Sequence, residues 1–278
     1  MREVCYTVGA VRYGPFLCGG QTVKFALMPG MIPWEDADDC QYLSTCLING
    51  KIALDAGSIG FLGTPEEQAA VGHIFLTHSH LDHLASLPIF LENVYHLRSR
   101  PPVIYASQVV LDVLQNDLFN DRLWPNFIRL SNQVRPFLRL VPFDPGQTVS
   151  IDGIHVTAIA VTHLVPTVGY LVNDGRSTVA FVPDTGPTDE IWQRARAYPD
   201  LRAVIVEATF PNEMAWLADL SKHLTPALLR GELDKLGRSV PTYVMHLKAR
   251  YRREVCEQLA ALNLENLSLL EPGKVYEF

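Results

Sequence analysis

Short apolar runs recur along the whole chain and alternate with polar, glycine- and proline-containing segments. Runs of this length, rich in Val, Ile and Leu, are typical of buried β-strands. We therefore predict strands at Val23–Leu27, Ile52–Leu54, Ile74–Leu76, Val103–Tyr105, Ile154–Val161, Val168–Val172, Thr178–Val182, Val204–Val206 and Thr242–Met245.

Helix patterns lie between several of these strands. Val109, Val110, Val113 and Leu114 form a helical stripe, which predicts a helix from Gln108 to about Phe119 with Ser107 as its N-cap. Thr225 followed by Pro226 is a start signal, because proline suits the first helical position, and it predicts a helix over Ala227–Leu236. Strands and helices alternate to the end of the chain, which indicates an α/β fold.

Composition and charge narrow the class of protein. The 278 residues are 48% hydrophobic and 19% charged, as in globular proteins with a substantial core. No polar linker or repeat divides them, so we expect one domain over 1–278. The net charge of −7 favours a small substrate and disfavours a long nucleic acid, which usually requires a basic surface.

Cysteine usage and the N-terminal residues bear on location. No apolar run reaches the roughly 18 residues of a membrane span, and no basic segment followed by an apolar one predicts a secretory signal. We expect no membrane association and a reducing cytoplasm, because an odd, scattered cysteine set is a poor disulfide framework. The five cysteines are Cys5, Cys18, Cys40, Cys46 and Cys256.

The densest cluster of ligand-type side chains follows the strand Ile74–Leu76. Within six positions the chain carries His78, His80, Asp82 and His83, although it has only nine histidines in all. A tight turn can direct the first two histidines to one metal ion and the following aspartate and histidine to a second. Imidazole nitrogen and carboxylate oxygen suit zinc, manganese or iron better than calcium or magnesium.

The spacing His78-x-His80-x-Asp82-His83 resembles the HxHxDH motif of the metallo-β-lactamase superfamily. This resemblance implies a four-layer αββα sandwich with metals at one edge of two facing sheets, and a lid-like insertion around 95–135. It also implies further ligands after later strands, and His163, Asp184 and His246 stand at such positions. Each of the three alone also has an ordinary structural interpretation as a strand-end or turn residue.

The resemblance divides the ligands between two divalent ions, for which zinc is favoured and manganese and iron are alternatives. His78, His80 and His163 would hold one ion, Asp82, His83 and His246 the other, and Asp184 would bridge them. Such a pair activates water and stabilises negative charge on an attacked phosphoryl or carbonyl group, so we expect a hydrolase in which Asp82 is also a catalytic residue.

A second resemblance concerns Glu207 and His223. Glu207-Ala208-Thr209 and Lys222-His223-Leu224-Thr225 resemble elements of the phosphodiesterase branch of the superfamily. There the histidine acts as general acid toward the departing alcohol, and the glutamate orients it; an alkoxide leaving group benefits strongly from a general acid. The alternative is a structural ion pair without a catalytic role.

Three further segments resemble class II cyclic nucleotide phosphodiesterases. They are Leu81 with Ser86-Leu87-Pro88 after it, the stretch containing Trp124-Pro125-Asn126-Phe127, and His246-Leu247-Lys248. Lys248 is a candidate phosphate contact. Trp124 and Phe127 are candidate stacking platforms for a base, with a core or dimer-contact role equally compatible with their type.

The combined prediction is a phosphodiesterase that hydrolyses 3′,5′-cyclic nucleotides, cyclic AMP and as a further candidate cyclic GMP, to 5′-monophosphates. A transfer-RNA 3′-processing endonuclease is the main alternative, disfavoured by the acidic charge and by Leu81, where those enzymes usually carry glycine. A lactonase or thioesterase would not need the Glu207–His223 pair. A purely structural metal site is a fourth option, although such sites are usually closed and thiolate-rich. Related folds often form homodimers, so a homodimer is a candidate assembly.

Overall fold

The computed structural model describes residues 22–28, 43–133 and 135–278. In this part of the chain the strands form two seven-stranded sheets. The order in the first sheet is β14 (Val275–Glu277), β1 (Lys24–Leu27), β2 (Cys46–Ile48), β3 (Ile52–Leu54), β4 (His73–Phe75), β5 (Val103–Ala106) and β6 (Arg139–Pro142). The order in the second is β13 (Leu267–Leu269), β12 (Thr242–Met245), β11 (Leu201–Glu207), β10 (Thr178–Val182), β9 (Thr167–Asn173), β8 (Ile154–Val161) and β7 (Thr148–Ile151).

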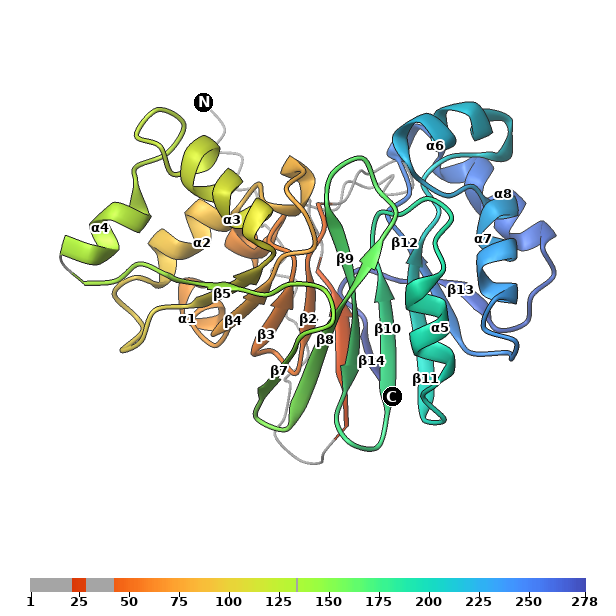
Figure 1. The fold of residues 1–278 in the computed structure, drawn as a ribbon, viewed down its shortest axis with the longest axis horizontal. Coiled ribbons are helices and arrows are strands. Elements are labelled where there is room, and N and C mark those ends of the chain that lie inside the picture. Colours follow the sequence, from red (N-terminus) through yellow and green to blue (C-terminus); the bar gives the residue numbers. More distant parts are fainter. Residues whose placement is uncertain (1–21, 29–42, 134) are drawn as a thin grey trace, which may run out of the picture.

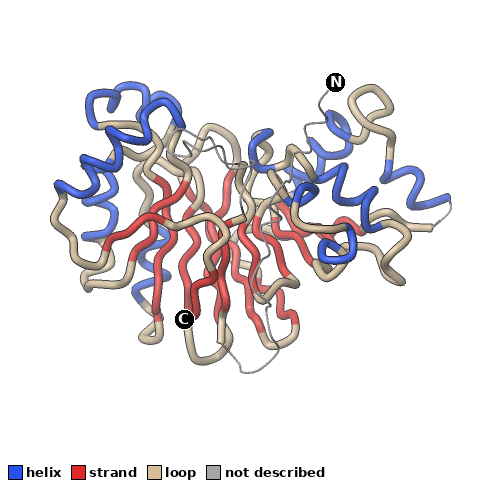
Figure 2. The backbone as a smooth tube through the Cα atoms, turned by 180° about the vertical axis from the view of Figure 1, so that it is seen from behind, coloured by secondary structure: helices blue, strands red, loops and turns tan. Residues whose placement is uncertain are grey.

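Helices cover the outer face of each sheet (Figures 1 and 2). The first sheet is covered by α1 (Pro65–Gln68), α2 (Leu87–Val94), α3 (Gln108–Val113) and α4 (Phe127–Gln133). The second is covered by α5 (Glu190–Arg196), α6 (Ala215–Ser221), α7 (Pro226–Asp234) and α8 (Arg252–Ala261). Short turns of other helix types are η2 (Ile59–Phe61), η3 (Leu81–His83), the π-helical η4 (Leu114–Leu118), η5 (Asn212–Met214) and η6 (Ala249–Tyr251). The four-layer αββα sandwich is confirmed.

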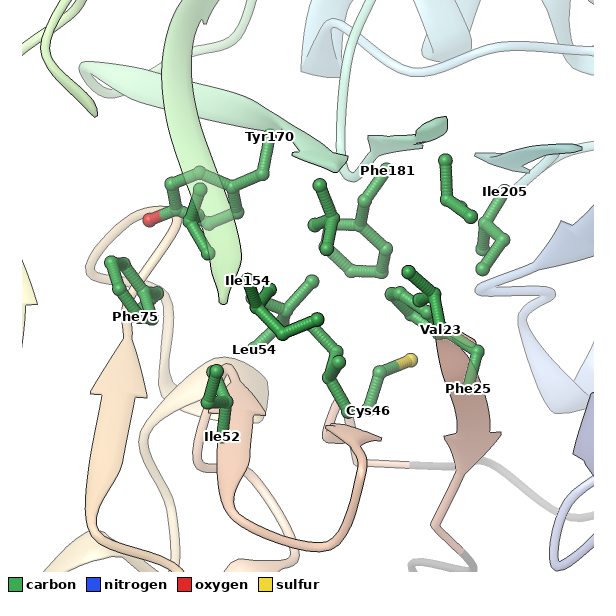
Figure 3. Close-up of a cluster of buried hydrophobic side chains, with 14 of the residues drawn as sticks. Val23, Phe25, Cys46, Ile52, Leu54, Phe75, Ile154, Tyr170, Phe181 and Ile205 are labelled. Atoms are coloured by element: carbon green, nitrogen blue, oxygen red, sulfur yellow. The ribbon is translucent and has the colours of Figure 1, made fainter. Parts of the chain in front are cut away.

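The core between the two sheets is strongly apolar. Side chains such as Phe25 and Phe75 from the first sheet meet Tyr170 and Phe181 from the second (Figure 3). The rings of Phe75 and Tyr170 lie edge to face with centroids 5.9 Å apart, a favoured aromatic geometry. Two further apolar layers pack each sheet against its helices. This burial holds the two sheets together, and with them the loops at their shared edge.

The nine predicted strands are all present, and five short strands were missed. β3, β8, β10 and β12 have the predicted bounds, whereas β2, β6, β7, β13 and β14 were not predicted. These five are three or four residues long, and β6 and β7 are largely polar or exposed. Their strand conformation comes from pairing with a neighbour, and such pairing leaves little pattern in a short sequence.

Both predicted helix starts are present, with one difference in detail. Thr225 caps α7 by accepting a hydrogen bond from the Leu228 amide at 3.3 Å. Ser107 stands at the N-cap of α3, but its hydroxyl makes no cap hydrogen bond. The predicted single helix from Gln108 continues beyond α3 as the π-helical turn η4.

The range 95–135 contains more than a loop over the site. β5 is an internal strand of the first sheet, and Leu114 and Phe119 are buried against that sheet's helices. The lid function predicted for this range therefore concerns only the segment after β5, and it stays a prediction.

Two observations concern the predicted cellular setting. No helix among the described residues has the length and apolar character needed to cross a membrane. Cys46 is a buried free thiol, and Cys5, Cys18 and Cys40 lie outside the described residues.

Candidate metal centre

The candidate ligands lie at the ends of strands from both sheets. β3 and β4 run parallel, and so do β10, β11 and β12, so their carboxyl ends share one edge of the sandwich (Figure 1). The HxHxDH segment follows β4, Asp184 follows β10 and His246 follows β12. His163 follows β8, which pairs antiparallel with β9 and turns at the same edge. Residues up to 168 positions apart in the chain, from His78 to His246, thus converge.

The predicted ligand atoms form two adjacent groups. His78, His80, His163 and Asp184 each place one ligand atom within 4.8 Å of the others. Asp82, His83 and His246 form the second group by the same criterion. The Asp184 carboxylate joins them: its Oδ2 lies 3.8 Å from His78 Nε2 and 3.4 Å from His83 Nε2, and its Oδ1 lies 3.4 Å from His246 Nδ1. The arrangement matches the predicted division of seven residues between two ions.

The donor atoms that face this cluster fit metal ions. His78 Nε2, His83 Nε2 and Asp184 Oδ1 are buried and have no hydrogen-bond partner. A buried polar atom without a hydrogen-bond partner lowers the stability of the folded state, and native structures rarely contain one. Two ring nitrogens, His163 Nε2 and His80 Nδ1, also approach each other to 3.2 Å. Cations between these atoms would satisfy all of them, and nitrogen with carboxylate oxygen is a donor set for zinc, manganese or iron.

Asp55 and Thr77 orient two of the histidines from behind. The Asp55 carboxylate is fully buried and accepts a hydrogen bond from His83 Nδ1 at 2.7 Å. Thr77 Oγ1 donates to Asp55 at 3.0 Å and can therefore accept from His78 Nδ1 at 2.9 Å. With Nδ1 carrying the proton, each ring presents a free Nε2 to the cluster. This is the usual arrangement behind metal-binding histidines.

Two other histidines are held in a similar way. His163 Nδ1 donates to the carbonyl of Lys222 at 2.9 Å. His246 Nδ1 lies 3.0 Å from Thr209 Oγ1, and that hydroxyl donates to Glu207 Oε2 at 2.6 Å. His246 Nε2 is then left to face Asp82, with Oδ2 at 3.3 Å. Thr209 thus connects the second ligand group to the Glu207 carboxylate.

Burial sets the charge state of several ligands. Burial, reinforced for His78 by the neighbouring His83, lowers the pKa of His78, His80 and His163, so these rings are neutral near pH 7, as a ligand must be. Burial alone would raise the pKa of Asp82, but the hydrogen bond from His246 and the nearby His83 hold it well below its ordinary value. Asp82 is therefore a carboxylate at neutral pH.

His223 and Glu207 form a buried pair beside the cluster. His223 Nδ1 donates to Glu207 Oε1 at 2.7 Å, and the Glu207 carboxylate also accepts from the backbone amides of Thr185 and Leu224. Burial alone would lower the pKa of His223, but the Glu207 carboxylate raises it above its ordinary value. His223 also lies within 4.8 Å of ligand atoms of Asp184 and His246. Glu207 thus favours the protonated form of this ring, which lies beside the predicted ligands.

The three predicted substrate contacts differ in position. Lys248 Nζ lies 3.7 Å from Asp82 Oδ2, at the margin of the cluster. Phe127 is buried, and its ring stacks on Phe119 and Phe137 at the start of α4, at the outer end of the first sheet's helices (Figure 1). Trp124 is half-buried against the same apolar layer. In this structure both aromatic residues belong to the helical layer, and base stacking by either would require rearrangement of this segment.

Asp55, Thr77 and Thr209 were not predicted from the sequence. A signal existed for the first: Asp55 directly follows the buried strand β3, which runs parallel to the strand that precedes His78. Parallel neighbours end at one edge, so a carboxylate there was to be expected near the metal motif. The two threonines carry no comparable signal, because threonine at a strand end is common.

Comparison with known proteins agrees with this geometry. The family model described as a beta-lactamase superfamily domain matches residues 59–247. A probable 3′,5′-cyclic-nucleotide phosphodiesterase from Yersinia pestis is 27% identical over 208 residues, which are 66% of this chain and 59% of that protein. A nuclear ribonuclease Z from Triticum aestivum is 29% identical over 129 residues, 46% of this chain and 68% of that protein.

Solved structures agree on the fold. Unliganded yeast PDE1 superimposes with a TM-score of 0.72 at 17% identity, covering 91% of this chain and 99% of that one. The chain spans little more than half the length of its cyclic-nucleotide phosphodiesterase relative from Yersinia pestis, so the match with that protein is partial. The family model, in contrast, takes in the predicted ligands from His78 to His246. This chain belongs to the β-lactamase superfamily.

Proposed function

We propose that this protein is a metal-dependent phosphodiesterase that hydrolyses 3′,5′-cyclic nucleotides to 5′-monophosphates. The observation that carries the proposal is the buried pair of Glu207 and His223 next to the ligand cluster, with 2.7 Å between His223 Nδ1 and Glu207 Oε1. A proton donor placed there suits a reaction with a poor alkoxide leaving group. A thioesterase, whose thiolate leaving group departs more easily without a proton, has less need of it. The similarity to proteins named cyclic-nucleotide phosphodiesterases supports the same substrate class.

His78, His80 and His163 would hold one ion, Asp82, His83 and His246 the second, and Asp184 would bind both. When bound, the ions supply an activated water and stabilise negative charge on phosphorus-bound oxygen. The donor set accommodates zinc, manganese and iron, and we favour zinc.

The contacts of His223 indicate which of its nitrogen atoms donates a proton in the reaction. Its Nδ1 is engaged by Glu207, so Nε2 carries the proton available for transfer. Water adds to phosphorus and gives up one proton to solvent, the bond from phosphorus to the 3′ oxygen breaks, and that oxygen takes the proton from His223 Nε2, which is restored from solvent. The products are a 5′-monophosphate and a free 3′-hydroxyl. Glu207 stabilises the protonated ring before transfer and fixes its orientation.

Lys248 would contact a nonbridging phosphate oxygen. Its side chain is about one-third exposed, and Nζ lies 3.7 Å from Asp82 Oδ2. An ammonium group there would offset the negative charge of the entering phosphate next to the Asp82 carboxylate.

The test is hydrolysis of cyclic AMP and cyclic GMP by protein of measured metal content, with 5′-AMP and 3′-AMP separated by chromatography. We expect 5′-AMP as the product, and no turnover after Asp184→Ala. Precursor transfer RNA and a simple lactone are assayed in parallel, because ribonuclease Z proteins are also among the relatives. Cleavage of the RNA alone, or of the lactone alone, by metal-replete protein would refute the proposal.

A further inference from the structure

The predicted ligands differ in their exposure to solvent. His78 and His83 are fully buried, and Asp184 is nearly so. His80, Asp82 and His163 are partly exposed. A substrate must therefore approach the cluster across the face that these three residues form.

Two large apolar side chains project from this same face. Leu81 stands between His80 and Asp82 and is 67% exposed, and Leu164 directly follows His163 and is 59% exposed. His80 Nδ1 and His163 Nε2 lie 3.2 Å apart, so the turn η3 and the loop between β8 and β9, which carry the two leucines, lie next to each other beside the cluster. The loop lies at the edge of the sandwich where the parallel strands end (Figure 1).

A single exposed leucine is ordinary, but two exposed leucines beside one polar cluster indicate contact with a ligand. The ammonium group of Lys248 lies beside the same cluster, with Nζ 3.7 Å from Asp82 Oδ2. The surroundings of the cluster thus combine a cation with exposed apolar side chains. A phosphate joined to an apolar ring system has the complementary distribution of charge.

We infer that Leu81 and Leu164 contact the base of the nucleotide and determine how tightly it binds. This inference rests on the proposed phosphodiesterase function and names the residues of the same site that recognise the nucleoside part. Leucine side chains have no hydrogen-bonding groups, so they discriminate weakly between bases. With these contacts alone, the kcat/KM values for cyclic AMP and cyclic GMP should differ by no more than roughly tenfold. An apolar contact surface separates similar ligands by only about one to two orders of magnitude.

The experiment compares the double variant Leu81→Ser/Leu164→Ser with the wild type and with Leu97→Ser, which changes an exposed leucine at the end of α2, remote in sequence from every predicted ligand. Metal content is measured for each protein. The double variant should raise KM for cyclic AMP by roughly tenfold or more with little change in kcat, because apolar contacts act equally on ground and transition states. The inhibition constant of inorganic phosphate should not change. Leu97→Ser should match the wild type.

A second readout is independent of turnover. Calorimetry on the same metal-loaded proteins compares binding of 5′-AMP with binding of inorganic phosphate, and the double variant should weaken only the former. Unchanged 5′-AMP affinity, or equal weakening of phosphate and 5′-AMP, would overturn the inference, since the latter would mean that the leucines support the ligand cluster. A wild type that binds 5′-AMP through these leucines and fails to hydrolyse cyclic nucleotides would refute the proposed function and leave the apolar contact supported.

Discussion

Four of the five candidate ligand histidines make a hydrogen bond through Nδ1 to a group outside the ligand set. Asp55, Thr77, Thr209 and the Lys222 carbonyl hold Nδ1 of His83, His78, His246 and His163, respectively. His223 follows the same rule with Glu207, but its pKa is raised, whereas burial lowers the pKa of His78. At the residue scale, similar imidazoles therefore favour different charge states, which is compatible with the proposed metal binding by His78 and proton donation by His223.

His223→Ala tests the proton donor. We expect turnover of cyclic AMP to fall by roughly two to four orders of magnitude, the usual contribution of a general acid, with metal content unchanged. The turnover of bis(para-nitrophenyl) phosphate should fall far less, because its leaving group departs without a proton. His155→Ala, at an exposed histidine on β8, is the control and should retain full activity. Equal losses on both substrates would contradict the assigned role.

At the scale of the elements, the turns that follow strands and helices place groups at the centre. Asp55, Lys222 and His246 have φ angles of 62°, 55° and 59°, a left-handed conformation that costs about 1–3 kcal/mol for residues other than glycine. Each of the three lies at the end of a strand or helix and presents a group to the centre. Backbone hydrogen bonds from neighbouring segments hold the turns of the centre in place. In the turn of the metal motif, the Asp82 carbonyl accepts a hydrogen bond from the amide of Ser44 at 2.9 Å.

Gly57 shows how tightly these turns pack. A Cβ atom at this position would lie 2.0 Å from the Asp82 carbonyl oxygen and 2.7 Å from the Ser44 amide nitrogen. Because both atoms belong to the backbone, Gly57→Ala must displace the turn that carries the metal motif. We expect lower metal affinity, and a loss in the free energy of unfolding of about 1–3 kcal/mol, typical of overpacking.

Metal titration and denaturant unfolding check this prediction. Gly231→Ala is the matched control, because Gly231 lies within α7 and a Cβ there meets nothing within 4 Å. That substitution should stabilise the helix by about 0.5–1 kcal/mol and leave metal binding unchanged. Wild-type metal affinity in Gly57→Ala would show that the turn can relax around the added methyl group.

At the scale of the whole molecule, the two sheets form a support on which the centre is assembled. Ligands from the first sheet (His78, His80, Asp82 and His83) meet ligands from the second (His163, Asp184 and His246) only because the apolar core fixes one sheet against the other. Metal ions would in turn join the two sheets at their edge. Binding to the folded state alone stabilises that state by mass action.

Removal of metal should therefore lower the thermal stability of the protein. Binding at a thousandfold excess over Kd contributes about 4 kcal/mol, which corresponds to a fall in Tm on the order of 10 °C when the metal is chelated. Calorimetric scans with and without chelator, before and after adding zinc back, measure this. Asp184→Ala should respond much less to chelator. An unchanged Tm in chelated wild-type protein would contradict a role of the metals in joining the sheets.

The metal motif and the later candidate ligands could be marked from the sequence, because His78, His163, Asp184 and His246 each lie within three positions of the end of an apolar strand. Their role as ligands stays a prediction, and the αββα fold was predicted from the family resemblance of the motif. The same local reasoning did not distinguish a core aromatic residue from a binding one, and it proposed base stacking for Phe127, which lies buried in the helical layer.

Only the tertiary structure decided which groups stand behind and around the ligands. Asp55 and His83 are 28 positions apart, and Thr209 and His246 are 37 apart, so their hydrogen bonds depend on the order of strands in each sheet. The same holds for Leu81 and Leu164, which follow strands of different sheets and flank histidines whose rings approach each other to 3.2 Å. A local pattern can mark the residue types that suit a metal. Which ring nitrogen is free, and which side of the cluster is open, depends on how distant segments pack together.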